Sequence, residues 1–341
     1  MSDAMLSPAV GAALWAGTLG TIAYCSKKLK DNLDEKMIPL MGVIGAFIFA
    51  AQMVNFTIPG TGSSGHLGGG MILAIILGPY AAFIVMASVL TIQAFLFADG
   101  GLLALGCNIW NLGVYPCFIA YPLIYKPLTR GDTRPVRIVA AALISAVIGL
   151  QLGAFSVVME TILSGRSELS FSAFSLMMLP IHLAIGLVEG VITAGVINYV
   201  RAARPEIIES VAASRPLGPG TSVKSVIVGF VAIAALTGGT LSWFASGNPD
   251  GLEWSIERIG GNPAPAEQGH GIARALKTFQ EKTAFLPDYT FKEDEEKALA
   301  GTDKKAGTSV SGLLGSLMVF AIILTVGLVI KKIRKKRPWS A

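Results

Sequence analysis

Long apolar runs separated by short polar connections dominate the chain. A membrane-spanning helix needs about 20 predominantly apolar residues, and the runs measured against this length predict nine spans. The third run is short and rich in glycine, and Gly78-Pro79 after it could end a helix or kink one long helix. The pattern predicts an all-α integral membrane protein, with a bundle of about seven spans followed by a two-span helical hairpin. The nine runs are Pro8–Tyr24, Pro39–Phe56, Leu67–Leu77, Pro79–Phe97, Leu102–Tyr125, Val136–Ile162, Phe174–Val200, Val223–Phe244 and Ser311–Ile330.

Lysine and arginine residues decide between the two readings of Gly78-Pro79. Cytoplasmic loops of membrane proteins are enriched in these residues, and all basic clusters can be cytoplasmic only if Gly78-Pro79 separates two spans. We therefore predict nine spans in the plasma (inner) membrane, with the N-terminus outside and the C-terminus in the cytoplasm. The clusters are Lys27–Lys36, Lys126–Arg137, Arg201–Lys224 and Lys331–Arg337.

One charged segment interrupts the second, smaller part of the chain. Of the 27 basic and 22 acidic residues, nineteen lie in Ala245–Val310. Long loops translocate largely regardless of their charge, so we expect this segment to lie outside, between the last two spans. The predicted division is a membrane domain (1–205), a cytoplasmic linker (206–221) and a two-span domain (222–341) with an extracytoplasmic loop (245–310).

The composition argues against several classes of function. A soluble protein carries about 25% charged residues, so a content of 14% excludes an ordinary cytosolic enzyme. The net charge of +5 comes without a compact basic domain, so we expect no nucleic-acid partner. Gly218–Ser225 approaches a phosphate-binding loop, but Val223 stands where the glycine before the lysine is required. We expect a non-enzymatic chain whose transport, if driven by ATP, uses ATPases on other subunits.

The segment Thr57–Gly70, TIPGTGSSGHLGGG, is predicted to connect the second and third spans on the outer face. Six of its fourteen residues are glycine, so its backbone can turn tightly and approach a ligand closely. His66 is its only good ligand for a borderline transition metal. A loop histidine hydrogen-bonded to its neighbours would explain the segment too, so the residues alone leave both roles open.

Four polar residues are predicted to lie within spans. Asn108 and Asn111 are one helical turn apart, and His182 and Glu189 share one helix face at i and i+7. Ionisable residues inside a membrane are costly and usually have a functional reason. The alternative is a buried His–Glu or Glu–amide pair that only joins helices.

Other side chains in the spans suggest packing or surface roles. Gln93 and Glu160 stand near outer span ends, so we expect them to reach the membrane interface. Small residues on one face of Ala9–Ala16 permit close helix packing, within the chain or against a partner subunit. The three cysteines are expected to be small buried apolar groups.

Four stretches of the first part stand out as motifs: Leu6-Ser7-Pro8, AAQMVNFTIPGTGSSGHLGGG (50–70), LFADGGLLALGCNIWNLG (96–113) and HLAIGLVEG (182–190). Together they resemble the CbiM/NikM family, the substrate-binding membrane components of energy-coupling-factor (ECF) transporters for cobalt and nickel. The second part contains PDGLE (249–253) and LPDY (286–289). It is similar to the small partner proteins CbiN/NikN, so the chain looks like a fusion of the two.

The resemblance implies the substrate-capture component of an ECF-type ABC importer, with Ni²⁺ or Co²⁺ as transported substrate and no tightly bound cofactor. Such an importer supplies cobalamin biosynthesis or nickel enzymes. The family's metal site lies on the outer face and uses an N-terminal Met-His pair and the histidine of SGHL, which is His66 here. Asn108, Asn111, His182 and Glu189 are candidate supporting residues.

The implied partners are the lipid bilayer, a transmembrane coupling subunit and cytoplasmic ABC ATPases. An ion-gradient-driven secondary transporter or channel is the alternative, with His182 and Glu189 as a proton relay. A membrane-bound assembly subunit without a ligand is a third possibility. Loss of transport on deleting an ATPase separates the first two, and failure to bind any metal favours the third.

The start of the chain departs from the family pattern, in which Met-His precedes an aspartate. This chain begins Met1-Ser2-Asp3, so either Asp3, Ser2 or the α-amine rebuilds the site with His66, or the start is assigned two codons late. We predict a native chain longer by a Met-His pair, because neither Ser nor Asp offers a side-chain nitrogen to the metal. The six nucleotides before the Met1 codon test this, and any other codons there would make Asp3 the leading candidate.

Overall fold

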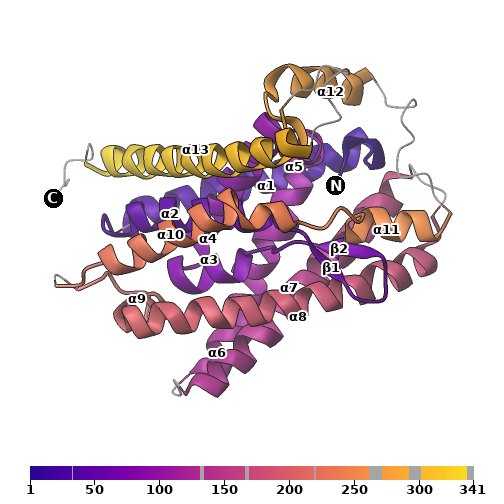
Figure 1. Cartoon of the computed structure of the whole chain (residues 1–341). Coiled ribbons are helices and arrows are strands. Elements are labelled where there is room, and N and C mark those ends of the chain that lie inside the picture. The colour runs from indigo at the N-terminus through magenta and orange to yellow at the C-terminus, as the bar shows by residue number, and fades with distance from the viewer. Residues whose placement is uncertain are drawn as a thin grey trace.

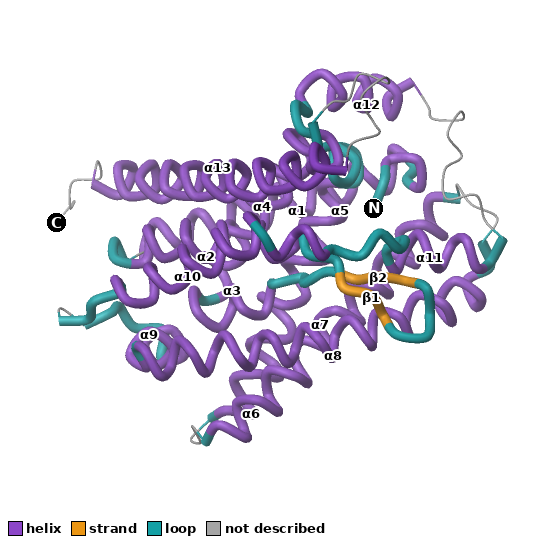
Figure 2. Tube along the Cα trace, viewed as in Figure 1, coloured by secondary structure: helices purple, strands orange, loops and turns teal. Residues whose placement is uncertain are grey.

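The computed structural model describes residues 1–32, 34–130, 134–165, 169–218, 220–260, 271–291 and 301–335, and helices dominate these ranges (Figures 1 and 2). Two short strands form an antiparallel hairpin. In chain order the elements are η1 (Asp3–Met5), α1 (Pro8–Asn32), α2 (Met37–Gln52), β1 (Phe56–Ile58), β2 (Ser63–Gly65), α3 (Gly70–Leu77), α4 (Pro79–Phe97), α5 (Leu105–Ile109), the π-helical η2 (Trp110–Tyr125), α6 (Lys126–Thr129), α7 (Pro135–Ser164), α8 (Phe171–Ala203), α9 (Pro205–Ala212), α10 (Lys224–Gly239), η3 (Leu241–Phe244), α11 (Gly251–Arg258), α12 (Gly271–Thr283), η4 (Pro287–Tyr289) and α13 (Gly301–Lys335).

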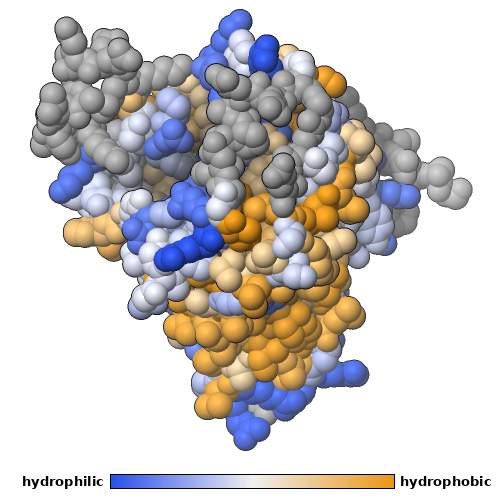
Figure 3. Space-filling view, turned by 90° about the vertical axis from the view of Figure 1, so that its right-hand side faces the viewer, coloured by the Kyte–Doolittle hydropathy of each residue, from blue (hydrophilic) through white to orange (hydrophobic). Residues whose placement is uncertain are grey.

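Five described helices, α1, α4, α7, α8 and α13, are long and apolar enough to cross a membrane, and α2 and α10 are shorter apolar helices. Large apolar side chains face outward from them, such as Val191, which is 63% exposed, and Leu317, which is 62% exposed. Figure 3 shows a broad hydrophobic area between a polar upper region and the polar tip at the lower end, where α6 lies in Figure 1. The predicted helical membrane protein is confirmed, whereas the count of nine spans stays a prediction.

The third predicted span is wrong as a helix, because only Gly70–Leu77 is helical. Eight residues of α-helix are about 12 Å long, so this helix by itself covers less than half of a hydrocarbon core of about 30 Å. Gly69 has φ 79°, which stops the helix from extending toward Leu67. The predicted separation at Gly78-Pro79 is confirmed, since α3 ends at Gly78 and α4 begins with Pro79.

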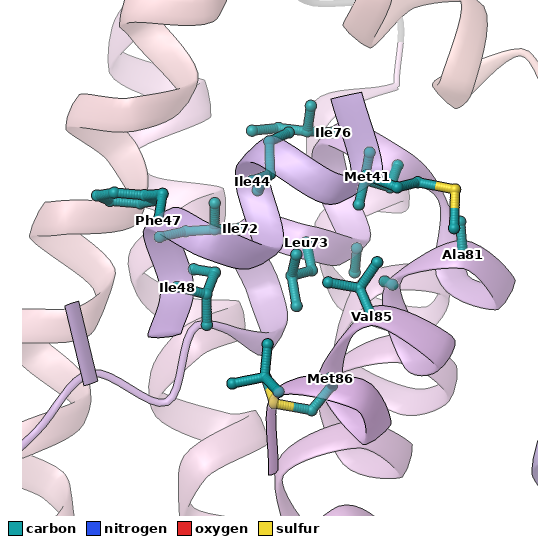
Figure 4. Close-up of a cluster of buried hydrophobic side chains, with 14 of the residues drawn as sticks. Met41, Ile44, Phe47, Ile48, Ile72, Leu73, Ile76, Ala81, Val85 and Met86 are labelled. Carbon is teal, nitrogen blue, oxygen red and sulfur yellow. The ribbon is translucent and has the colours of Figure 1, made fainter. Parts of the chain in front are cut away.

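The short helix α3 lies in the centre of the bundle, and all eight of its residues are buried. Its side chains Ile72, Leu73 and Ile76 pack between α2 and α4 (Figure 4). Lipid tails are as apolar as these side chains, so close van der Waals packing holds such helices together. The three cysteines are free and buried, as predicted.

The second part of the chain packs against the first through glycines on α2. A Cβ added at Gly42 would lie 2.8 Å from Phe320 of α13, and one added at Gly45 would lie 2.4 Å from Ile323. Small residues at such positions let helix backbones approach closely in a membrane. The α13 helix is therefore docked along α2 rather than standing apart from the bundle.

The two ends of the bundle carry different parts of the chain. The N-terminus, the hairpin, α11 and α12 lie at one end, and α9 lies at the other (Figure 1). At the α9 end, Lys36 Nζ donates to Gly218 O at 2.8 Å, and Asp34 Oδ2 accepts from Leu217 N–H at 2.8 Å. Lys331 forms a salt bridge with Glu35 at the same α1–α2 connection. Residues of three of the four basic clusters thus meet at one end, whereas the orientation of the chain in the membrane stays a prediction.

Replacing Gly45 by valine should destabilise the packing of α13 on α2. The new side chain would overlap Ile323, and overpacking typically costs about 1–3 kcal/mol. Thermal unfolding of the detergent-purified protein should show a lower Tm. Gly195→Val is the matched control, since a Cβ at this α8 glycine meets nothing within 4 Å. Equal Tm values for the two variants would contradict the docking.

Candidate functional site

The glycine-rich segment between α2 and α3 forms a hairpin followed by an extended stretch. In β1 and β2, Phe56 pairs with Gly65 and Ile58 pairs with Ser63. The connecting turn contains Gly60 and Gly62 with φ of 78° and 80°, a conformation that favours glycine. His66 follows β2 directly and is half-buried, with Nδ1 3.2 Å from Leu67 O.

The stretch after His66 is fixed by a carboxylate on α8. Glu189, only 4% exposed, accepts the Gly68 N–H at Oε2 and the Gly69 N–H at Oε1, both at 3.0 Å. These amides stand at the N-terminus of α3, where unpaired N–H groups and the helix dipole favour a negative charge. A Cβ at Gly68 would lie 2.8 Å from Glu189 Oε2, so this contact requires glycine.

A glutamine pair holds the other side of the same peptide. Gln52 Nε2 donates to Gly68 O at 2.9 Å, and Gln93 Nε2 donates to Gln52 Oε1 at 3.0 Å. The prediction that Gln93 reaches the membrane interface is wrong, because Gln93 is 4% exposed and bonded inside the bundle. The peptide group between Gly68 and Gly69 is therefore bound through both its C=O and its N–H.

The beginning of the charged insert binds strand β2 and the turn of the hairpin. Ser64 N–H donates to Pro249 O, and Ser64 Oγ donates to Asn248 O, both at 2.8 Å. Further along, Trp254 Nε1 donates to Thr61 O at 2.9 Å. These bonds join residues more than 180 positions apart, so the insert fixes the hairpin that leads into His66.

The residues of the PDGLE motif form the N-terminal cap of helix α11. Asp250 is the N-cap of α11 and accepts from the N–H groups of Leu252 and Glu253 at 2.8 Å, while Glu253 accepts from Asp250 N–H, which is a capping box. Gly251 permits close approach to α8, because a Cβ there would lie 2.9 Å from His182 Cε1. The motif thus starts a helix and places it against α8.

The end of the insert binds the connection after α4. Gln280 of α12 donates to Ala94 O and Gly100 O, at 2.9 and 2.6 Å. The Tyr289 ring stacks on Phe97 with centroids 5.0 Å apart, and its hydroxyl donates to Asp99. Burial raises the pKa of Tyr289 well above its usual value. The insert therefore contacts both the hairpin after α2 and the connection after α4.

A cavity of about 130 Å³ lies where these elements meet. Four of the predicted site residues line it, namely His66, Asn108, Asn111 and His182. Asp250 of the insert lines it as well. Glu189 lines a smaller adjoining cavity of about 10 Å³, which shares Gly68 and Asn111 with the larger one. The structure brings together side chains from the hairpin, η2, α8 and the insert.

The asparagines and the α8 residues have separate partners. Asn111 Nδ2 donates to Glu160 Oε2 at 3.1 Å, and Asn108 Nδ2 lies 3.5 Å from Met1 O. The expected exposure of Glu160 is wrong, since this carboxylate is 4% exposed and is held by Asn111. His182 Nδ1 bonds Met178 O at 2.8 Å. Glu189 therefore forms a Glu–amide pair with the backbone N–H groups of Gly68 and Gly69, which is one of the alternatives that the sequence left open.

Asp3 and Ser2 lie outside the cavity lining. Asp3 Oδ1 accepts from the Ala104 N–H at 2.9 Å at the start of α5, and burial raises the pKa of Asp3. Ser2 is exposed. Among the described residues, no three His, Cys, Asp or Glu side chains cluster as a metal site. The remaining histidine of the chain, His270, lies outside the described residues.

The sequence pattern did not reveal four contributors to the site, namely Gln52, Ser64, Trp254 and Glu160. Gln52 was a signal in principle, because a glutamine in an apolar run must find a partner in the membrane. The bonds of Ser64 and Trp254 to distant segments had no signal in the local pattern. The Asn111–Glu160 pair was missed because Glu160 was assigned to the interface.

Comparisons with known proteins match two family models to the chain. The sequence model of the CbiM family, described as a cobalt uptake substrate-specific transmembrane region, matches residues 1–207, and that of the PDGLE domain matches residues 224–332. The resemblance seen in the motifs is confirmed.

Two relatives match over nearly their whole length. A putative fused nickel transport protein NikMN of Archaeoglobus fulgidus is 35% identical, over 94% of this chain and 95% of its own. A fused nickel transport protein NikMN of Rhodobacter capsulatus is 30% identical, over 96% of each chain. A crystal structure of a transition metal transporter is 31% identical with TM-score 0.53, covering 60% of this chain and 94% of that one. The predicted class of transport protein rather than enzyme is confirmed.

Replacing His66 by alanine should abolish high-affinity binding of Ni²⁺ and Co²⁺. Loss of an imidazole ligand should raise the Kd by at least about 10- to 100-fold, the range for loss of an outer-shell partner. The Tm should change little, because His66 is half-buried and its hydrogen bond is to the adjacent residue. Calorimetric titration of the folded variant measures this, and an unchanged titration would refute the role of His66.

Replacing Trp254 by alanine should loosen the hairpin. The variant loses the bond to Thr61 O and the packing against the cluster of Ile58, Ile181 and Ile185, so amide hydrogen exchange in residues 56–65 should rise. Metal uptake should fall more than equilibrium affinity, because the substitution frees the hairpin and removes no proposed metal ligand. Trp243→Ala is the matched control, because Trp243 bonds Ser309 instead of the hairpin. Equal hydrogen exchange in both variants would contradict the role of Trp254 in holding the hairpin.

Proposed function

The chain belongs to the CbiM family of cobalt-uptake transmembrane proteins, in a form joined to a PDGLE domain, and we propose that it captures Ni²⁺ or Co²⁺ for an ECF-type ABC importer. The observation that supports this most is the cavity beside His66, at the end of the bundle where the insert and the N-terminus meet. An imidazole nitrogen suits both metals. Cobalt and nickel enter as transported substrates, as the names of the relatives indicate for those proteins.

In this proposal the His66 end of the bundle faces the outside of the plasma membrane and the α9 end faces the cytoplasm. The lysines and arginines support the orientation, because Lys36, the linker and Lys331 meet at the α9 end. The polar insert then lies outside, where it meets the metal before the bundle does. The division into domains 1–205 and 222–341, joined by linker 206–221, remains part of the proposal and agrees with the two matched ranges.

The proposed partners are a transmembrane coupling subunit and cytoplasmic ATPases. The α1 helix has an unoccupied face of small residues, since Ala12, Ala13 and Ala16 are exposed along it. Small residues suit close packing against a helix of another subunit in the membrane. The packed linker at the α9 end offers a polar surface for the cytoplasmic partners.

Reconstitution into liposomes tests the proposal. The chain alone should bind metal but should not accumulate it, because the sequence lacks a phosphate-binding loop with the required glycine. Adding the coupling subunit and ATPases with ATP should give uptake that Ala13→Leu reduces and Val191→Leu, the control on lipid-facing α8, does not. Strong uptake by the chain alone, driven by an ion gradient, would favour a secondary transporter instead.

A further inference from the structure

The cavity beside His66 contains a second imidazole. His182, on α8, lines the same cavity of about 130 Å³. The chain contains only three histidines, so two of them face one small space. The two histidines come from segments that are more than 110 positions apart in the sequence.

The His182 ring is held so that one nitrogen stays free. Its Nδ1 lies 2.8 Å from Met178 O, and a carbonyl only accepts, so Nδ1 carries the proton and Nε2 has the lone pair. Within the described part of the chain, Nε2 has no hydrogen-bond partner. Metal-binding histidines commonly donate their other ring N–H to a backbone carbonyl, which fixes the tautomer. His66 has the same arrangement with Leu67 O.

The separation of the two rings is fixed by the backbone between them. Gly65 abuts α8, since a Cβ there would lie 2.4 Å from Ile185, and the Gly68 and Gly69 amides bond Glu189. His182, Ile185 and Glu189 lie on one face of α8 at spacings of three and four. The stretch carrying His66 is therefore bound along the face that carries His182.

A polar atom without a partner also points to a ligand in this cavity. Asn111 lines the cavity and is 6% exposed, and its Oδ1 is buried without a hydrogen bond among the described residues. Its Nδ2 donates to the Glu160 carboxylate, so the amide cannot turn over without losing that bond. A buried acceptor without a donor is costly. Water on a metal ion would supply the donor.

The size of the cavity agrees with an ion that keeps part of its water. A cavity needs only about 10–15 Å³ of this kind of volume to hold one water, so 130 Å³ leaves room for a small ion with several waters. Divalent first-row metals accept neutral imidazole as a ligand. Both rings and the Asn111 oxygen can therefore act on one ion.

We propose that His182 Nε2 is a second metal ligand in this cavity, beside His66, and that Asn111 Oδ1 accepts a hydrogen bond from water on the same ion. The assignment rests on the proposed function, since it concerns the metal captured there. His66 lies on a hairpin-bound segment, whereas His182 lies on a long helix. The metal would thus bridge the segment to α8.

X-ray absorption of the chain beginning at Met1-Ser2-Asp3, without the predicted Met-His extension that would add an imidazole, counts the imidazoles on the metal after purification with a histidine-free tag and loading with one equivalent of Ni²⁺. We expect two for the unaltered chain and one for His66→Ala, His182→Ala and His182→Gln. The count should stay two for His270→Ala, which removes the remaining histidine of the chain. The Ni²⁺ Kd of both His182 variants should rise at least about tenfold. The glutamine variant keeps the size and an N–H donor if the alanine variant does not fold.

One imidazole on the metal in the unaltered chain, or an unchanged count and Kd in a folded His182 variant, would overturn the proposal. A purely structural role for His182 would lower stability and leave the count at two. Failure of the proposed function looks different, since the unaltered chain would then bind neither Ni²⁺ nor Co²⁺.

Discussion

The bidentate bond between the Glu189 carboxylate and the Gly68 and Gly69 amides determines how the His66 end of the molecule is built. A buried carboxylate is expensive in a membrane unless it is paired, and unpaired N–H groups at a helix start are expensive too. Each satisfies the other here. The short helix α3 can therefore begin in mid-bundle, and the chain before it is left extended, which positions His66 beside the cavity rather than within a helix.

The insert completes this arrangement from the opposite side. Its backbone binds Ser64 in the hairpin, and Gln280 binds the connection after α4, so two connections at this end of the first part are held by the second part. Docking of α13 on the glycines of α2 fixes the position of the helix at which the insert ends. Joining the two parts in one chain therefore keeps the insert at a fixed position relative to the cavity, which is a physical reason for their fusion.

Much of the fold follows from the local pattern of the sequence. Apolar runs gave the long helices, Gly78-Pro79 gave the break between α3 and α4, and the glycine content marked the segment of His66. The third span failed because periodicity does not show that an extended backbone can enter a bundle when a distant carboxylate binds it. Gln93 and Glu160 were misplaced for a related reason, since their partners Gln52 and Asn111 come from other helices. Pairings across more than 40 residues leave no trace in the pattern of one chain.

Anomalous diffraction at the nickel absorption edge, from the full chain loaded with Ni²⁺, tests the central claim most directly. The account predicts one strong peak inside the cavity between the hairpin and α8, at about 2.0–2.1 Å from a ring nitrogen of His66, the usual distance for a metal–imidazole bond. The bonds of Glu189 to Gly68 and Gly69 should remain in that structure. A dominant peak outside this cavity, or a metal bound only by the insert, would contradict the account.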